Sequence, residues 1–236
     1  MSFFQNHKLF NFLNRPQWKT VQGGSQNYIQ CLMNASHFQV QLSSQIKSIY
    51  RTPQIQIHTP KERLFFDYLV FACSPKTFLP LLMDKTAEEI KLLSIFQFQP
   101  NLAQLHQNSS LMPPHRAAWS SWNFHTNEDQ LCTLTYWMNR LQPLATQDQF
   151  FVSLNQHKKN PLYQTVYEHP IFSLDTLQAQ KDIGYLQGRQ QTYYAGSYLG
   201  YGFHEDGIQS ALKICQHLHI EPKGFSNPDT SRIPWN

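Results

Sequence analysis

Residues Thr192 to Ala211 read TYYAGSYLGYGFHEDGIQSA, and this stretch decides the fold. Its residues 193–195 form a short apolar-aromatic run that is typical of a buried strand. Glycines at positions 196, 200 and 202 then mark a loop. From Ile208 to Leu218 the apolar residues recur at spacings of three and four, which predicts a helix. A strand, a glycine loop and a helix N-terminus in this order can point backbone N–H groups at a ligand, and the spacing alone is equally consistent with a plain turn.

Four segments of the sequence, in the same order, resemble the flavin-containing amine oxidase superfamily. They are residues 18–28 (WKTVQGGSQNY), 110–122 (SLMPPHRAAWSSW), 135–141 (TYWMNRL) and 200–207 (GYGFHEDG). They are most similar to a bacterial branch of predicted NAD/FAD-binding oxidoreductases, and they extend over nearly the whole chain. In this family a strand ending in Ala-Gly precedes a loop and a helix whose N-terminus lies near the flavin ring. The resemblance therefore implies FAD-dependent oxidation of an amine or of an apolar, lipid-like substrate.

The resemblance also implies which residues contact the FAD. The matching positions are Gly23, Gly24, Ser25, Ile46, Ser74, Gly196, Ser197, Phe203, His204, Glu205, Asp206, Gly207 and Ile208. We expect a helix to begin at Gly207, with its exposed N–H groups next to the flavin ring. From the residues alone, Ile46 is equally consistent with an ordinary core residue. Glu205 and Asp206 are likewise consistent with a simple role in capping the helix. His204 is the candidate for a catalytic, proton-transferring group, although Phe203 is the alternative residue to face the ring.

The pattern of apolar residues predicts an α/β fold in two lobes. An incomplete FAD-binding lobe is expected from residues 1–99 and 190–236, and a substrate-binding lobe with a mixed, mainly antiparallel sheet from residues 100–189. In the first lobe, alternation at 38–42 and 55–57 predicts strands, and the continuous apolar run 66–72 predicts a strand buried on both faces. Ser25 is expected to cap a helix over 26–34, and Thr86 with Glu89 to form a capping box.

Short aromatic-rich strands are expected in the middle of the chain, at 102–106, 117–124, 131–137, 150–154 and 165–168. They are followed by a helix over 174–186, with Asp175 or Ser173 as its cap. Four aromatic residues, Trp119, Trp122, Tyr136 and Trp137, are candidates to line a pocket for a flat or apolar substrate. An aromatic core is the other interpretation of each of them.

The chain contains no G-x-G-x-x-G turn, which holds the FAD pyrophosphate in Rossmann-type sites. We therefore expect it to be the second half of a larger or split flavoprotein, binding FAD non-covalently with a first half that a separate chain can supply. No catalytic triad or paired carboxylates can be assembled by spacing, and flavin chemistry does not require them. The alternatives are a non-catalytic remnant without flavin and a lipid- or peptide-binding protein.

Composition excludes several classes of partner. The net charge is only +4, with 19 Lys and Arg against 15 Asp and Glu and no basic cluster, so nucleic acid is not an expected partner. The apolar runs are too short for a transmembrane segment, and the N-terminus lacks the pattern of a secretory signal. The four cysteines are spread singly, which predicts buried free thiols in the cytoplasm and no zinc site. The expected substrate is therefore a small molecule, and no metal site is expected.

Overall fold

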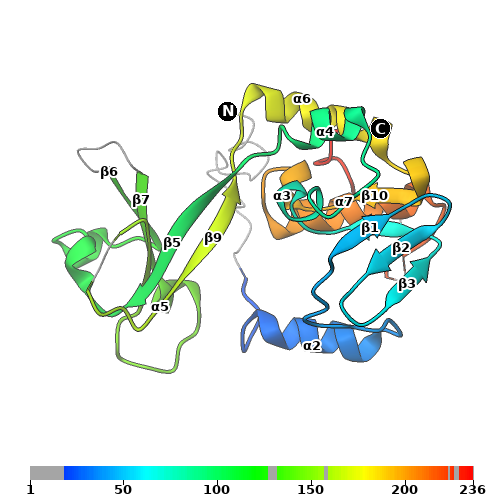
Figure 1. Ribbon diagram of the computed structural model, residues 1–236. Helices are drawn as coiled ribbons and strands as arrows, with labels where there is room; N and C mark the ends of the chain where they lie inside the picture. The colour runs from blue at the N-terminus through cyan, green and yellow to red at the C-terminus, as the bar shows by residue number, and fades with distance from the viewer. Residues whose placement is uncertain (1–18, 127–131, 157–158, 223, 226–228, 236) are drawn as a thin grey trace. The chain divides into compact units, whose positions relative to one another are not determined.

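The computed structural model describes residues 19–126, 132–156, 159–222, 224–225 and 229–235 (Figure 1). The chain forms two compact units, one from Met1–Val40 with Pro100–Glu168 and the other from Gln41–Gln99 with His169–Asn236. This division differs from the expected lobes at residues 1–40 and 169–189. The α/β class with antiparallel sheets is confirmed.

The parallel pair of strands in the second unit joins distant parts of the chain. Strand β10 (Thr192–Tyr194) pairs with β4 (Leu69–Phe71), and the amide of Ala195 continues the ladder to the carbonyl of Phe71 at 2.9 Å. Leu69 and Phe71 are buried, whereas Val70, on the opposite face, is 48% exposed. The prediction of a strand buried on both faces is therefore wrong. Among the described residues β4 pairs with β10 alone, and no element buries the Val70 face.

A three-stranded antiparallel meander precedes this pair. It consists of β1 (Ser48–Tyr50), β2 (Ile55–His58) and β3 (Arg63–Phe66). The strand expected at 38–42 is not formed. All three alternating apolar residues, Phe38, Val40 and Leu42, are exposed. Their alternation therefore does not correspond to the buried face of a strand.

The helices of the second unit enclose its core. They are α3 (Pro75–Phe78), α4 (Ala87–Leu93), α6 (Leu174–Asp182) and α7 (His204–His217), with short 3₁₀ turns η3 (Ile183–Leu186), η4 (Arg189–Gln191) and η5 (Ser197–Leu199). Figure 1 shows α4 and α6 side by side. The capping box of Thr86 and Glu89 is confirmed, with contacts of 3.2 and 2.8 Å. Ala179 and Ile183 are buried in the same core as β4 and β10, which is why 169–189 belongs to this unit.

A buried charge cluster ties α4 to β1 and β10. The Arg51 guanidinium contacts both carboxylate oxygens of Glu89 and lies 3.0 Å from Asp84 Oδ1. The Tyr194 hydroxyl donates to Glu89 Oε1 at 2.7 Å. Burial alone would raise the pKa of Glu89, but the hydrogen bonds from Arg51, Thr86 and Tyr194 hold it below its usual value. The cluster is thus a charged network that is satisfied only in the folded unit.

The C-terminal residues pack into the core of this unit. Ile233 and Trp235 are each 2% exposed, and Lys213 of α7 donates to the carbonyl of Ile233 at 3.0 Å. The same ammonium lies 4.8 Å from the centre of the Trp235 ring. Ile233 and Trp235 therefore anchor α7 through Lys213, although this segment forms neither a helix nor a strand.

The first unit contains a five-stranded sheet in the order β6-β7-β8-β5-β9. The strands are β5 (Phe98–His106), β6 (Trp122–Thr126), β7 (Cys132–Trp137), β8 (Phe151–Leu154) and β9 (Tyr163–Pro170), with α5 (Met138–Leu141), η1 (Ser109–Leu111) and η2 (Arg116–Ala118) between them. The pairs β6–β7, β7–β8 and β5–β8 are antiparallel, as expected. The strand predicted at 117–124 begins only at Trp122, because residues 116–118 turn as η2.

Helix α2 (Ser25–Ala35) also belongs to this first unit. The helix begins at Ser25, and the capping position is Gly24, whose φ of 85° suits glycine. The prediction of Ser25 as the cap is therefore wrong by one residue. Trp18, the first residue of the resembling segment 18–28, lies outside the described residues.

No helix in the described part of the chain is long and apolar enough to cross a membrane. Cys31 and Cys73 are exposed free thiols and Cys215 is half-buried, so the expectation of buried thiols is wrong for these three. Cys31 lies on α2, none of whose residues is buried.

Candidate cofactor and substrate site

The loop after β10 is fastened to the first turns of α7 through Ser210. The Gly196 amide donates to Ser210 Oγ at 2.9 Å, and this hydroxyl donates to the carbonyl of Gly207 at 2.7 Å. Gly196 has a φ of 151°, and a Cβ there would lie 2.6 Å from the Tyr198 ring. Glycine is therefore required at the end of the strand, and the loop has a defined position against the helix.

Helix α7 begins at His204, three residues before the predicted start at Gly207. The amide of Gly207 donates to the carbonyl of Phe203 at 3.2 Å, so it is not an open donor, and the expectation that it is one is wrong. Among the described residues, the amides of His204 and Glu205 have no acceptor. The open donors at the positive end of the helix therefore belong to these two residues.

Asp206 has a structural role inside this turn. Its side chain is fully buried, and Oδ2 accepts from the amide of Phe203 at 2.8 Å. Oδ1 lies 3.0 Å from Arg232 Nε, in an ion pair without hydrogen-bond alignment. A Cβ at Gly200 would lie 2.6 Å from the same oxygen. Of the two interpretations of this carboxylate, helix capping is therefore the one that applies to Asp206.

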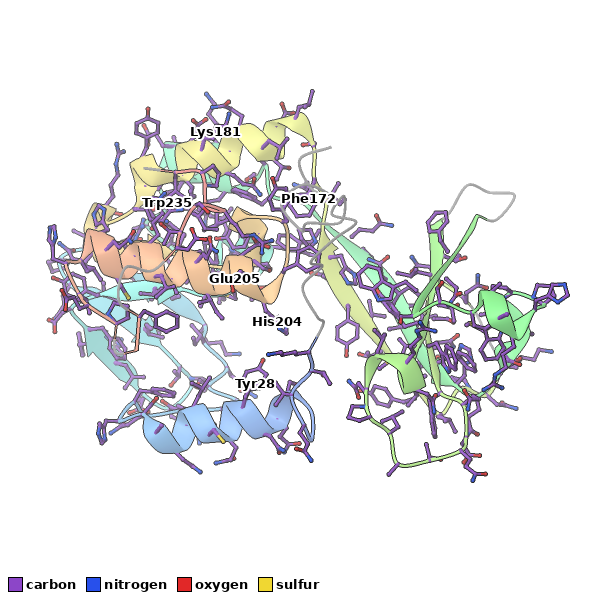
Figure 2. All side chains as sticks on the ribbon, turned by 180° about the vertical axis from the view of Figure 1, so that it is seen from behind. Tyr28, Phe172, Lys181, His204, Glu205 and Trp235 are labelled. Carbon is purple, nitrogen blue, oxygen red and sulfur yellow. The ribbon has the colours of Figure 1, made fainter. Side chains whose placement is uncertain are left out.

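The exposed surface at the start of α7 includes three of the predicted residues, His204, Glu205 and Ile208, with Gly202 beside them, whereas Phe203 is half-buried. Figure 2 shows His204 and Glu205 at this end of the helix. Glu205 Oε1 accepts from the side chain of Gln209 at 2.8 Å. A Cβ on Gly207 would meet only the amide of Ser197, at 3.8 Å. The chain itself thus leaves room over Gly207.

The other predicted cofactor residues have ordinary structural surroundings. Ile46 is half-buried and packs against the core of the second unit, as its alternative interpretation expects. Ser74 precedes α3, and its hydroxyl lies 2.9 Å from the hydroxyl of Thr77. Gly23, Gly24 and Ser25 lie at the start of α2 in the other unit, where the Gly24 amide donates to the carbonyl of Val21 at 3.0 Å.

The four candidate substrate aromatics form two separate pairs. Trp119 and Trp137 are in edge contact at 5.2 Å, next to Phe151 and beneath the Arg116 guanidinium. Trp122 and Tyr136 are in edge contact at 5.9 Å. Since Tyr136 and Trp137 are adjacent in β7, they point to opposite faces of the sheet. The four residues therefore do not line one pocket.

The face with Trp122 is the more exposed apolar surface. Trp122 is 50% exposed and its neighbour on the same face, Phe124, is 61% exposed. The strand register continues this face from Trp122 through Tyr136 to Val152 and Leu105. It is a row of apolar side chains across four strands, which suits an apolar ligand.

Several residues that hold the loop were not identified from the sequence. Gln180 of α6 donates to the carbonyls of Tyr198 and Gly200, at 2.9 and 2.6 Å. Gln187 exchanges two hydrogen bonds with the backbone of Tyr194, both at 2.9 Å. Glutamine has no distinctive spacing signal, so only the structure reveals these contacts. Both side chains fix the ends of the glycine loop from within the core.

The residues present fit one end of an FAD molecule. The room over Gly207 and the open amides of His204 and Glu205 suit the edge of a flavin ring. The pyrophosphate requires a glycine-rich turn before a helix, and the sequence contains none of the G-x-G-x-x-G type. This chain therefore fits the ring end of FAD and does not itself fit the pyrophosphate.

No protein-family model matches the sequence, and no curated protein matches it. Solved structures do match. A CLA-producing fatty acid isomerase from P. acnes aligns with a TM-score of 0.61 and 14% identity, over 84% of this chain and 52% of that one. A putrescine oxidase variant with redesigned cofactor binding has a TM-score of 0.56 and 9% identity, over 84% and 53%. A reduced UDP-galactopyranose mutase has a TM-score of 0.50 and 10% identity, over 74% and 46%.

The chain thus spans about half the length of the solved structures that it matches. At these identities the likeness concerns the fold alone, and it agrees with the family resemblance in the sequence. The chain thus has a fold like that of the fatty acid isomerase and the putrescine oxidase over about half of their length.

Proposed function

We propose that this chain is the second half of an FAD-dependent oxidoreductase of the amine oxidase type. The observation that carries the proposal is the defined loop between β10 and α7, which leaves space over Gly207 and two open amides at the helix end. The fold of the solved neighbours supports it. The proposed substrate is an amine or an apolar, lipid-like molecule, for which the exposed sheet face around Trp122 is the candidate contact surface.

The first half of the flavoprotein supplies the phosphate-binding turn in this proposal. It is either a separate chain or another part of a longer polypeptide. The parallel pair β4–β10 supports an incomplete cofactor lobe, because parallel sheets in α/β proteins are normally larger and covered on both faces. The exposed Val70 face and the remaining edges of the pair are then surfaces for that half.

The bound flavin supplies the electron acceptor, and the residues of this chain position it. The amides of His204 and Glu205, at the positive end of α7, favour negative charge on the part of the ring that faces them. Ser210 keeps the loop at its distance from the helix, and Gly207 allows the ring to approach. His204 is exposed and is the candidate to move a proton to or from the substrate.

The test is co-expression with a neighbouring reading frame that encodes a G-x-G-x-x-G unit, followed by measurement of flavin released on denaturation. We expect flavin in the purified complex. Gly207→Val should lose the flavin or shift its reduction potential, because the added side chain occupies the space over the loop. Ala211→Val, one turn later on the same face of α7, is the control and should change neither.

The isolated Gly207→Val chain separates a folding defect from a binding defect. A Cβ added at Gly207 would have no neighbouring atom closer than 3.8 Å, so the variant should keep the circular dichroism and melting temperature of the parent chain within about 3 °C. A complex in which Gly207→Val retains the parent flavin content, spectrum and potential would show that the stretch is only a turn. A complex without flavin would favour the non-catalytic alternative.

A further inference from the structure

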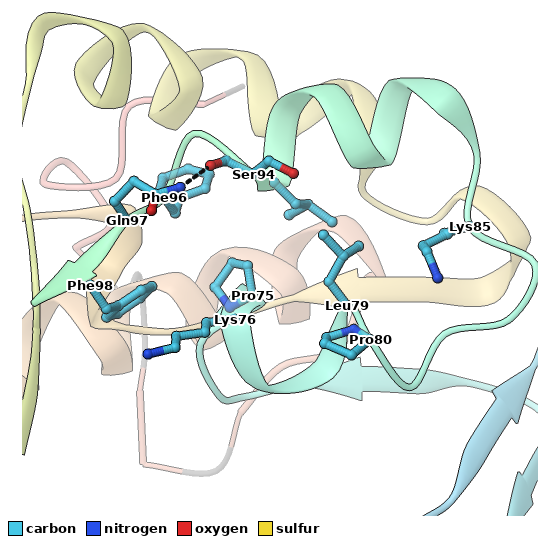
Figure 3. Close-up of a pocket in the computed structure, with 10 residues that line it drawn as sticks. Pro75, Lys76, Leu79, Pro80, Lys85, Ser94, Phe96, Gln97 and Phe98 are labelled. Atoms are coloured by element: carbon cyan, nitrogen blue, oxygen red, sulfur yellow. Dashed lines mark hydrogen bonds between the residues drawn. The ribbon is translucent and has the colours of Figure 1, made fainter. Parts of the chain in front are cut away.

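A pocket of about 440 Å³ lies between α3, the end of α4 and the first residues of β5 (Figure 3). This volume is within the range of small-ligand sites, about 300–1,000 Å³. Its apolar lining consists of Pro75, Leu79, Pro80, Leu93, Phe96 and Phe98. None of these residues belongs to the loop between β10 and α7, and none is among the residues expected to contact FAD, although Pro75 directly follows Ser74.

The floor of the pocket is part of the packed core. Leu93 and Phe96 are 1% and 4% exposed, and the Phe96 ring is in edge contact with Tyr198 at 4.9 Å. The side chain of Gln97, also in the lining, donates through Nε2 to the carbonyl of Ser94 at 2.6 Å. The apolar surface therefore has a fixed shape before any ligand arrives.

The charged groups in the lining are two lysines, Lys76 and Lys85, and no carboxylate lines the pocket. Figure 3 shows them at opposite ends of the lining. The Lys85 ammonium donates to the carbonyl of Leu82 at 2.8 Å, and an ammonium has three protons to donate. In the part of the chain that the structure describes, Lys85 forms no ion pair.

Two of the three carboxylates nearest to Lys85 in the sequence are already engaged elsewhere, and the third, Glu88, is exposed in the first turn of α4 and does not line the pocket. Asp84 accepts from the Arg51 amide at 2.6 Å and from its Nε at 3.0 Å, and Glu89 is bound by the same guanidinium. Arg51 thus engages Asp84 and Glu89. The pocket combines a preformed apolar floor with the positive charge of Lys85 at one end.

We propose that this pocket binds an organic carboxylate with an apolar chain or ring, whose apolar part lies on Leu79, Phe96 and Phe98. The carboxylate pairs with the Lys85 ammonium, which its contact with Leu82 already holds in place. A single amine at that end matches a single negative charge. An apolar body without the carboxylate, or with a positive group, lacks this partner.

The test is equilibrium dialysis of the full chain against radiolabelled decanoate, below its micelle concentration, with decanol and decylammonium as comparison ligands. We expect saturable binding of one decanoate, with decanol about tenfold weaker and decylammonium weaker still, because each loses the charged hydrogen bond. Lys85→Gln should weaken decanoate binding about tenfold and leave decanol unchanged.

Two further variants make the result specific to the pocket. Lys91→Gln removes an exposed lysine of α4 that does not line the pocket, and it should bind decanoate like the parent chain. Ser94→Trp places a large side chain at the rim and should abolish binding of both decanoate and decanol. Equal affinity for the three ligands, or decanoate binding that is unchanged in both Lys85→Gln and Ser94→Trp, would overturn the proposal.

Discussion

Replacing Arg51 by methionine tests whether the buried charge cluster holds the second unit together. Arg51 is 2% exposed, and its side chain makes four nitrogen–oxygen contacts with Glu89 and Asp84. Its removal leaves the Glu89 carboxylate buried with only the Thr86 amide and the Tyr194 hydroxyl as donors. Breaking a buried ion pair in this way costs about 3–5 kcal/mol, a large part of a typical stability of about 5–15 kcal/mol.

Urea unfolding measures this loss. For a slope of about 2 kcal/mol per molar urea, a loss of about 4 kcal/mol lowers the midpoint by about 2 M. Adding Glu89→Leu to Arg51→Met removes the stranded charge and should recover about 1 kcal/mol, even though the cap of α4 is lost. A midpoint change below about 0.5 M for Arg51→Met, or a double variant that is weaker by the full sum of both losses, would refute the reasoning.

The same cluster makes stability depend on pH. The pKa of Glu89 is lowered in the folded chain, so its contribution is fully present above its unfolded value of about 4.3 and is lost as the pH falls through the lower folded value. When the free energy of unfolding of the parent chain is measured from pH 6 to pH 3, it should therefore fall below about pH 4.3. Arg51→Met should show a shallower slope in this window, because the main group that lowers the pKa is gone.

Three further outcomes are expected. The chain purified alone should carry little or no FAD, since it has no phosphate-binding turn, and stoichiometric flavin released on denaturation would contradict this. Light scattering of the isolated chain should show self-association through its exposed apolar faces, and Val70→Lys should reduce it, whereas a parent chain that stays monomeric and binds no hydrophobic dye would argue for a self-sufficient fold. Trp235→Ala should lower the stability to urea by about 3 kcal/mol, because Trp235 is buried against α7, and a change below about 1 kcal/mol would show that the tail is not an anchor.

Local patterns predict those elements whose signals lie within a few residues. The capping box of Thr86 and Glu89 is readable because the capping residue and its target are three positions apart, and Ser173, one of the two expected caps of α6, accepts from the Thr176 amide at the same spacing. The apolar periodicity, which begins at Ile208, starts four residues after the first residue of α7, because the first turn is polar and does not contribute to it. Asp206, three residues after Phe203, is the available signal for the true start.

Long-range contacts are not readable in this way. The parallel pairing of β4 with β10, and the charge cluster that Arg51 forms, join residues far apart in the sequence. The separation of Tyr136 from Trp137 is a different case, because neighbours in a strand always point to opposite faces. That rule, applied to the expected strand 131–137, is sufficient to divide the aromatic candidates into two sets from the sequence alone.

The pairing of β4 with β10 has a consequence for the order in which the chain folds. About 120 residues separate the paired positions Leu69 and Thr192, so the pair closes a very long loop. In the simple polymer estimate, the part of the closure cost that grows with length is about 4 kcal/mol for such a loop. During synthesis β4 emerges from the ribosome long before its partner exists, with its apolar residues exposed. The intervening sheet can form within that interval, and a nascent-chain pulse of protease should find the β4 region cleavable until residues beyond Tyr194 have emerged.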